Sequence, residues 1–284
     1  MPGTRDEAPE PRVHAALQRV QKHPVPAVLI FVATVLGLVG TFSQSWGWLQ
    51  ERFWPAPEAR TDPYAPLAAL SLDSRLEYFE ETFGVARSTV DVCADGTCPE
   101  PPPQPLQLVV HETDDVVVRG LFAADALAAY TVTTKDETYT PPVRWVDRDL
   151  GQLGTRTTQE ILDGVGAAGG PLGEASVRQG TTWLSYVDVF PGGAPADYRG
   201  LILAWTVDGV DSPIDVATAG HLADARDGGG PDLQANPAYA RALTQIRATT
   251  RPNTYGEYRD DGPLAAWLQD PENVQGLLFE GSEA

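Results

Sequence analysis

Histidines are the residues of this chain best suited to acid–base or metal chemistry. The sequence contains four, of which His111 and His221 lie in its main part and His14 and His23 lie near its start. Neither His-x-x-x-His nor His-Glu-x-x-His, the spacings typical of metal-binding helices, occurs in it. An enzyme would therefore need an active site that tertiary structure assembles around His111 or His221.

Carboxylates and small residues add no further catalytic pattern. Glu112, Asp114 and Asp115 follow His111 and could hold a divalent cation, but acidic residues between two β-rich runs are typical of a hydrophilic turn. The Gly-x-Ser-x-Gly motif is absent, and the glycine-rich segment 164–173 lacks the Lys-Ser/Thr of a phosphate-binding loop. The sequence thus indicates no cofactor and no metal, and it favours a non-enzymatic protein.

The chain has two cysteines, Cys93 and Cys98. The Asp95-Gly96 pair between them is a strong turn former, so the two thiols are expected to face each other. In an oxidising compartment they would form a disulfide that closes a small loop. A zinc site is the alternative, but two cysteines without further Cys or His nearby provide too few ligands. We predict the disulfide.

A segment near the C-terminus, residues 251–262, combines tyrosines, arginines, an asparagine and glycines. Aromatic and arginine side chains are enriched where proteins contact partners. We therefore expect a contact surface formed by Arg251, Asn253, Tyr255, Tyr258 and Arg259. Alternatively, Asn253 and Gly256 form a turn and Tyr255 packs against the sheet.

One stretch, Pro24–Leu49, is far more apolar than the rest of the chain. Its densest part, residues 25–42, would be roughly 27 Å long as a helix, which is about the thickness of a bilayer core. We predict a transmembrane anchor rather than a cleaved signal peptide, because a long tail precedes it. Basic residues before it favour a cytoplasmic N-terminus. Tryptophans expected at the membrane interface follow it: Trp46, Trp48 and Trp54.

Small residues lie on one side of the predicted membrane helix. Ala33, Gly37 and Gly40 would let two helix backbones approach closely, which predicts a homodimer through the anchor. The alternative is that glycine and alanine are simply common in membrane helices. A membrane effector that acts through oligomerised anchors would depend on this face.

Charge excludes one class of partner. The 284 residues carry a formal net charge of −19. Since phosphate backbones are bound by clustered Lys and Arg, nucleic acid is not expected as a partner. Lysine occurs only as Lys22 and Lys135, and this bias towards arginine is typical of a GC-rich genome. We infer a bacterial source, with a halophile as the alternative.

Periodicity predicts an α+β fold in which an antiparallel sheet is flanked by helices. Ser74 and Glu77 form a capping box for a helix that ends at Gly84, and a strand over 85–92 follows. Further strands are expected at 106–111, 116–122, 127–134, 181–190 and 198–207. A second capping box at Thr157–Glu160 precedes the later strands, so two α-β-β units are possible. Helices are expected from Pro237, Pro263 and Pro271.

These expectations divide the chain into five parts. Residues 1–23 form a cytoplasmic tail, 24–49 the anchor, 50–66 a proline-rich connector, 67–250 an extracytoplasmic α+β domain, and 251–284 a C-terminal helical extension and tail.

Two short segments carry a resemblance. The run Tyr130–Asp136 with Pro141, and later Asn253–Gly256, resembles an uncharacterised group of single-pass bacterial membrane proteins. The resemblance implies no activity and no site residues.

The leading functional interpretation is a membrane-anchored extracytoplasmic binding protein, located in the cell membrane, whose partner is another envelope protein or a cell-wall ligand. It depends on the single anchor, the disulfide and the lack of a catalytic motif. The alternative is an envelope hydrolase or metal-dependent enzyme with its site near His111 or His221.

Overall fold

The computed structural model describes residues 62–94, 101–146, 148–165, 173–179, 184–192, 198–207, 209–211, 213–228 and 233–279. Residues 64–284 form one compact unit. Its helices are α3 (Ala65–Ala68), α4 (Leu76–Phe83), α5 (Thr158–Val165), α6 (Val216–Asp227), the 3-10 helix η1 (Leu233–Ala235), α7 (Pro237–Thr249), α8 (Ala265–Gln269) and α9 (Pro271–Phe279).

The strands are β1 (Ser88–Asp91), β2 (Leu106–Glu112), β3 (Val116–Ala123), β4 (Ala126–Thr134), β5 (Pro142–Trp145), β6 (Arg148–Gln152), β7 (Glu174–Gln179), β8 (Leu184–Phe190), β9 (Arg199–Trp205) and β10 (Thr254–Arg259). Eight of them form one sheet in the order β1-β2-β3-β4-β10-β9-β8-β7, and every neighbouring pair is antiparallel. Strands β5 and β6 form a separate two-stranded ribbon. This is the predicted α+β fold with a large antiparallel sheet.

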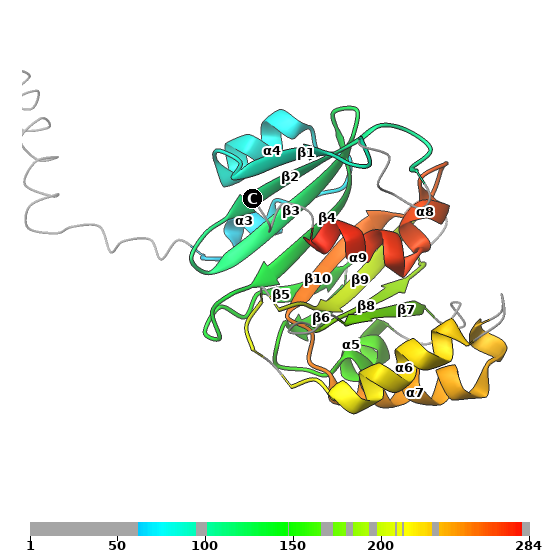
Figure 1. The fold of residues 1–284 in the computed structure, drawn as a ribbon. Coiled ribbons are helices and arrows are strands. Elements are labelled where there is room, and N and C mark those ends of the chain that lie inside the picture. The colour runs from blue at the N-terminus through cyan, green and yellow to red at the C-terminus, as the bar shows by residue number, and fades with distance from the viewer. Residues whose placement is uncertain are drawn as a thin grey trace, which may run out of the picture. The chain divides into compact units, whose positions relative to one another are not determined.

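Helices cover both faces of the sheet. On one face α8 and α9 cross the front of the sheet in Figure 1, and Trp267, Leu268 and Leu277 pack against strand residues there. On the other face Phe79 of α4 and Ile161 of α5 share a second core with the sheet. The α6–α7 pair covers the β7–β8 end of that face. Burial on both faces explains why the strands read as nearly continuous apolar runs.

Local sequence signals set several helix starts. At α5 the Thr157 N–H donates to Glu160 Oε2 at 2.8 Å and the Glu160 N–H donates to Thr157 Oγ1 at 3.3 Å, which is the predicted capping box. At α7 the Asn236 side chain accepts from the N–H of Ala238 and Pro237 is the first helical residue, as expected. Helix α9 begins at Pro271, also as expected.

The start of α4 differs from the prediction. The helix begins at Leu76, and its N-cap residue is Arg75, which makes no side-chain capping bond. The backbone before the helix pairs instead with the first residues of β4, because the N–H of Leu127 donates to the carbonyl of Ser74 and Arg75 forms a β-bridge with Ala126. The backbone of Ser74 is therefore held by this long-range pairing, and its side chain does not form the predicted cap.

The C-terminal segment requires a correction. We expected residues 251–284 to extend from the domain, but β10 lies in the middle of the sheet between β4 and β9. The expected boundary after residue 250 therefore does not separate two structural units. Sequence periodicity missed this strand because it is six residues long and its polar members, including Glu257, are buried by tertiary packing.

The predicted anchor lies outside the described residues, as do its interfacial tryptophans and its small-residue face: Trp46, Trp48, Trp54, Ala33, Gly37 and Gly40. Within the part of the chain that the structure describes, no helix is both long and apolar enough to cross a membrane. The anchor, its orientation and its pairing stay predictions.

The central position of β10 yields a test of stability. A Cβ at Gly256 would lie 2.0 Å from the carbonyl oxygen of Tyr130 on β4, so Gly256→Ala forces two central strands apart. We expect it to lower the free energy of unfolding by about 3 kcal/mol. Urea denaturation followed by circular dichroism measures the change.

Gly220→Ala in α6 is the matched control. A Cβ at Gly220 meets nothing within 4 Å, and alanine favours a helix over glycine, so this variant should gain about 0.5–1 kcal/mol. Equal stability of the two variants would contradict the described position of β10.

Candidate functional site

His111, the first candidate for an enzyme, is sealed inside the domain. It lies on β2 with its ring centroid 5.2 Å from that of Phe79 and 6.0 Å from that of Phe83, and it is 3% exposed. Burial lowers the pKa of His111, although the charge of Glu80 and the backbone of Val85 act in the opposite direction. Neither ring nitrogen makes a hydrogen bond of ordinary geometry within the described structure. This histidine is a neutral core residue and not an accessible base.

His221, the second candidate, lies on the exposed side of α6. In the part of the chain that the structure describes, no group of three or more His, Cys, Asp or Glu side chains is placed to hold a metal ion. The structure therefore places the two histidines on different elements, β2 and α6, and shows neither of them in such a group among the described residues. The sequence could not show this, because neither helix nor strand periodicity places two distant segments.

The predicted contact segment is largely buried. Asn253, Tyr255 and Tyr258 are 0%, 4% and 0% exposed, because they precede or belong to the central strand β10. Asn253, just before β10, binds the backbone just after the neighbouring strand β9. Its side chain accepts from the N–H of Thr206 at 2.9 Å and donates to the carbonyl of Thr206 at 2.7 Å. Only Arg251 and Arg259, at the ends of the segment, reach the surface to any extent. The expected contact surface is thus wrong for its three middle residues.

Burial creates a polar cluster that the sequence did not reveal. Glu257 on β10 is 4% exposed and lies near Arg199, whose Nη1 is 3.5 Å from its Oε2. Burial raises the pKa of Glu257, and hydrogen bonds from Arg199, Tyr130 and the backbone of Val146 partly offset that increase. Val146 has φ +54°, an uncommon conformation for a β-branched residue.

This cluster holds the β5–β6 ribbon against the sheet. The indole N–H of Trp145 on β5 donates to the carbonyl of Arg199 on β9 at 3.0 Å. The strained turn at Val146 brings its N–H to Glu257. Because protein groups supply the donors of this buried carboxylate, its role is to fasten the ribbon rather than to receive a ligand.

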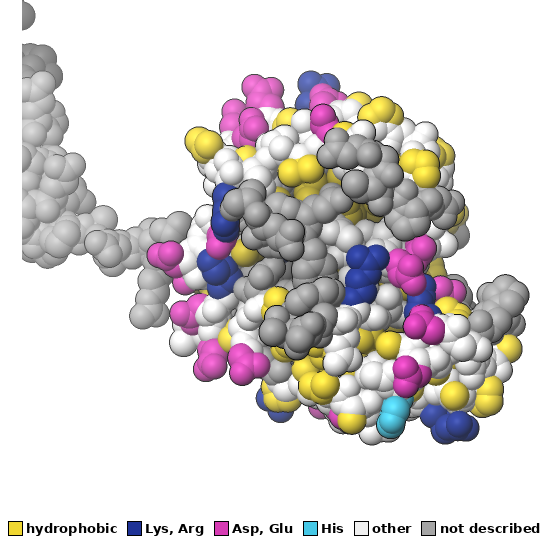
Figure 2. All heavy atoms as spheres, viewed as in Figure 1, with side chains coloured by type: hydrophobic (Ala, Val, Ile, Leu, Met, Phe, Trp, Pro, Cys, Tyr) yellow, Lys and Arg dark blue, Asp and Glu magenta, His cyan; other side chains and the backbone are white. Residues whose placement is uncertain are grey.

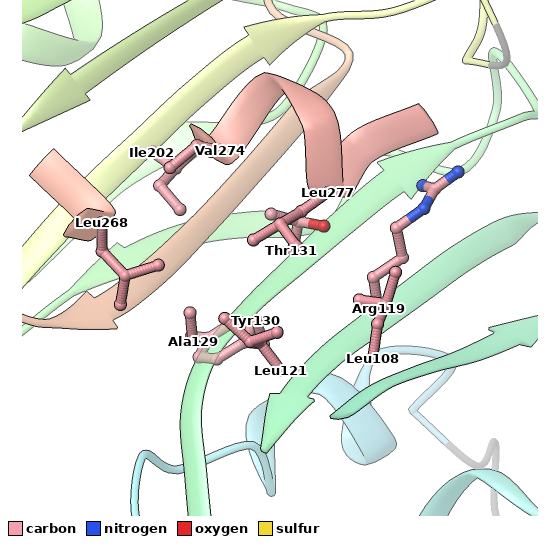
Figure 3. Close-up of a pocket in the computed structure, with 10 residues that line it drawn as sticks. All are labelled: Leu108, Arg119, Leu121, Ala129, Tyr130, Thr131, Ile202, Leu268, Val274 and Leu277. Carbon is pink, nitrogen blue, oxygen red and sulfur yellow. The ribbon is translucent and has the colours of Figure 1, made fainter. Parts of the chain in front are cut away.

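A small cavity lies under the C-terminal helices (Figure 3). Its volume is about 20 Å³, which is close to the space that one water molecule requires. Apolar side chains line most of it, among them Leu121, Ile202 and Leu277, whereas the guanidinium of Arg119 points away from them in Figure 3. A cavity of this size cannot hold a metabolite, so it is a packing gap.

The two edges of the sheet differ in a way that bears on binding. At β7 the Tyr239 hydroxyl accepts from the Ala175 N–H at 2.9 Å and donates to the Ala175 carbonyl at 3.1 Å. Arg226 donates to the same carbonyl at 3.0 Å. These side chains occupy the backbone N–H and C=O of Ala175, so another strand cannot pair with β7 at that residue. Strand β1, at the opposite edge, pairs only with β2 within the described structure.

The surface around β1 is exposed and in part apolar. Thr89 and Asp91 are exposed, Val85 before the strand is 98% exposed, and Tyr78 on α4 is 46% exposed. We call Val85, Thr89 and Asp91 the β1 surface. Figure 2 shows apolar and acidic side chains together at the top of the view, over α4 and β1.

Hollows flank the C-terminal end of β1. One of about 510 Å³ is lined by Val92, Cys93 and prolines 101–103, and another of about 330 Å³ is lined by Gln107 and Phe122. Asp91 lines both. A strand docked on β1 would therefore find room for a side chain at this end.

Cys93 follows β1 directly. It has φ +62° and packs, partly buried, against the core beneath α8 and α9. Cys98 lies outside the described residues, so the Cys93–Cys98 disulfide stays a prediction. A bond at this position would hold the loop that leaves β1.

The buried state of His111 predicts a pH effect on stability. Its folded pKa is below the usual 6.5, so the unfolded chain binds the proton more readily and stability is lost as the pH falls below 6.5. His111→Phe keeps an aromatic ring against Phe79 and removes the proton. We expect the loss of unfolding free energy between pH 7.5 and 5.5 to shrink in this variant.

The exposed His221 provides the control. His221→Gln should keep the wild-type pH dependence in the same urea titrations, because His221 lies on the exposed side of α6 and takes no part in the packing around His111. An unchanged slope in His111→Phe would show that His111 is hydrated and not sealed behind α4.

Comparisons with protein-family models, with curated proteins and with solved structures gave no match. Function must therefore be inferred from the residues and their arrangement.

Proposed function

We propose that this protein is a membrane-anchored extracytoplasmic binding protein that contacts another envelope protein or a cell-wall ligand. The apolar stretch Pro24–Leu49 would be the anchor, with the N-terminus in the cytoplasm. A Cys93–Cys98 disulfide would suit the oxidising side of the membrane. The domain that begins at Tyr64 would then present its surface outside the cell.

The observation that supports binding most directly is the open β1 edge. An exposed sheet edge offers backbone donors and acceptors to a partner strand, and neighbouring side chains add selectivity. The other edge is closed by Tyr239 and Arg226, so the two edges are not equivalent. Val85, which precedes β1 and is almost fully exposed, supplies apolar area that an isolated surface would not need.

The alternative of an envelope hydrolase or metal-dependent enzyme has less support. His111 is packed between phenylalanines, and His221 is exposed on α6 away from it. The net charge of −19 argues against nucleic acid as the ligand. A binding protein requires neither histidine for acid–base or metal chemistry, and the exposed β1 edge would be its contact surface.

Location can be tested with the two native cysteines. In intact cells, a membrane-impermeant maleimide should label the protein only after treatment with an impermeant reductant, because the thiols would be outside and paired. Labelling is read as a mass shift on a gel. Labelling that requires lysis and no reductant would put free thiols in the cytoplasm and would overturn the location.

Binding at the β1 surface can be tested by photo-crosslinking. A benzophenone amino acid in place of Val85 in the full chain should yield a discrete crosslinked species in cells, because the 98% exposed side chain borders the open edge. The same amino acid in place of Val216, a 54% exposed valine on α6, is the control. Equal crosslinking at both positions, or none at Val85, would contradict a binding role for β1.

A further inference from the structure

We propose that the β1 edge binds the β1 edge of a second copy of this chain, antiparallel and centred on Thr89, so that two eight-stranded sheets become continuous. This inference rests on the proposed function, because it names the partner of the same open edge. It concerns the extracytoplasmic domain and is independent of the predicted pairing of the anchors.

Charge complementarity selects the second copy and the register. When two antiparallel strands are centred on Thr89, residues 87 and 91 lie opposite each other. Arg87 then faces Asp91 of the second copy, and the two-fold symmetry repeats the pair. Opposite charges at directly opposed positions stabilise a strand pair, and like charges destabilise it. A strand with this sequence is therefore complementary to itself.

Arg87 is able to make this additional contact. Its side chain is 48% exposed and pairs with Glu112 on the neighbouring strand β2. A guanidinium carries five N–H donors, so one carboxylate does not saturate it. Asp91 is exposed at the other end of the strand.

The four-residue strand alone is too small for a stable dimer, since specific interfaces bury about 1,200 Å² or more. Val85 precedes the strand and would add apolar area to the interface. Carboxylates on α4 and the overall negative charge oppose association of free chains. Attachment of both copies to one membrane would offset this repulsion by raising their effective concentration.

The test uses the full chain in detergent micelles and in cell membranes. Thr89→Cys places two thiols opposite each other across the two-fold axis, within the Cα separation of 4.4–6.8 Å that a disulfide or a short bis-maleimide spans. We expect a crosslinked species of twice the monomer mass. Gln179→Cys, exposed at the end of the closed β7 edge, is the matched control and should remain monomeric.

Charge reversal tests the register. R87D and D91R each place like charges opposite each other twice per dimer, and either should lower the crosslinked fraction by about tenfold. The double variant R87D/D91R restores opposite charges and should recover crosslinking. Thermal unfolding of each variant checks that the domain remains folded.

The outcomes are distinguishable. A Thr89→Cys crosslinked fraction that stays the same in both R87D and D91R, or that equals the fraction of the Gln179→Cys control, would overturn the proposed dimer. A Val85 crosslink of a mass other than twice the chain would also overturn it while leaving the proposed binding function in place. Absence of any Val85 crosslink would overturn both.

Discussion

The double pairing of β10 is the constraint on which the rest of this structure depends. The meander β2–β4 and the meander β7–β9 do not pair with each other, and β10 joins them by pairing with β4 on one side and β9 on the other. Glycine is required at position 256 because the carbonyl of Tyr130 approaches too closely for a Cβ. Both helix layers depend on this junction, since each packs across strands from both halves.

A buried ion pair secures the second half of the sheet. Arg247 on α7 binds Asp188 on β8 through two hydrogen bonds of 2.6 and 2.7 Å, and the Tyr186 hydroxyl donates to the same carboxylate at 2.6 Å. Arg247 also donates to the carbonyl of Gly173 and lies over the ring of Phe190. Such a network stabilises little compared with an apolar core, but it fixes one orientation of α7 on the sheet. The β7 edge then lies within reach of Tyr239.

Closure of one edge leaves the other as the place for interaction. Among the residues that the structure describes, the α6–α7 pair that buries β7 has no counterpart beside β1, because α4 packs over the face of the sheet and Thr89 and Asp91 are exposed. Short length and charged residues protect such an edge from indiscriminate pairing. The same charges can select one partner, which is why the edge is compatible with specific binding.

Sequence patterns determined the fold class, most strands of the first half, and the starts of α5, α7 and α9, because these depend on apolar periodicity and local capping. Tertiary structure alone decided the position of β10, since polar residues such as Glu257 are buried there by distant strands. It also decided the sealed environment of His111 and the inequality of the two sheet edges, because long-range packing has no signature in neighbouring residues. The candidate surface was therefore not predictable, although Arg87 and Asp91 were visible in the sequence throughout.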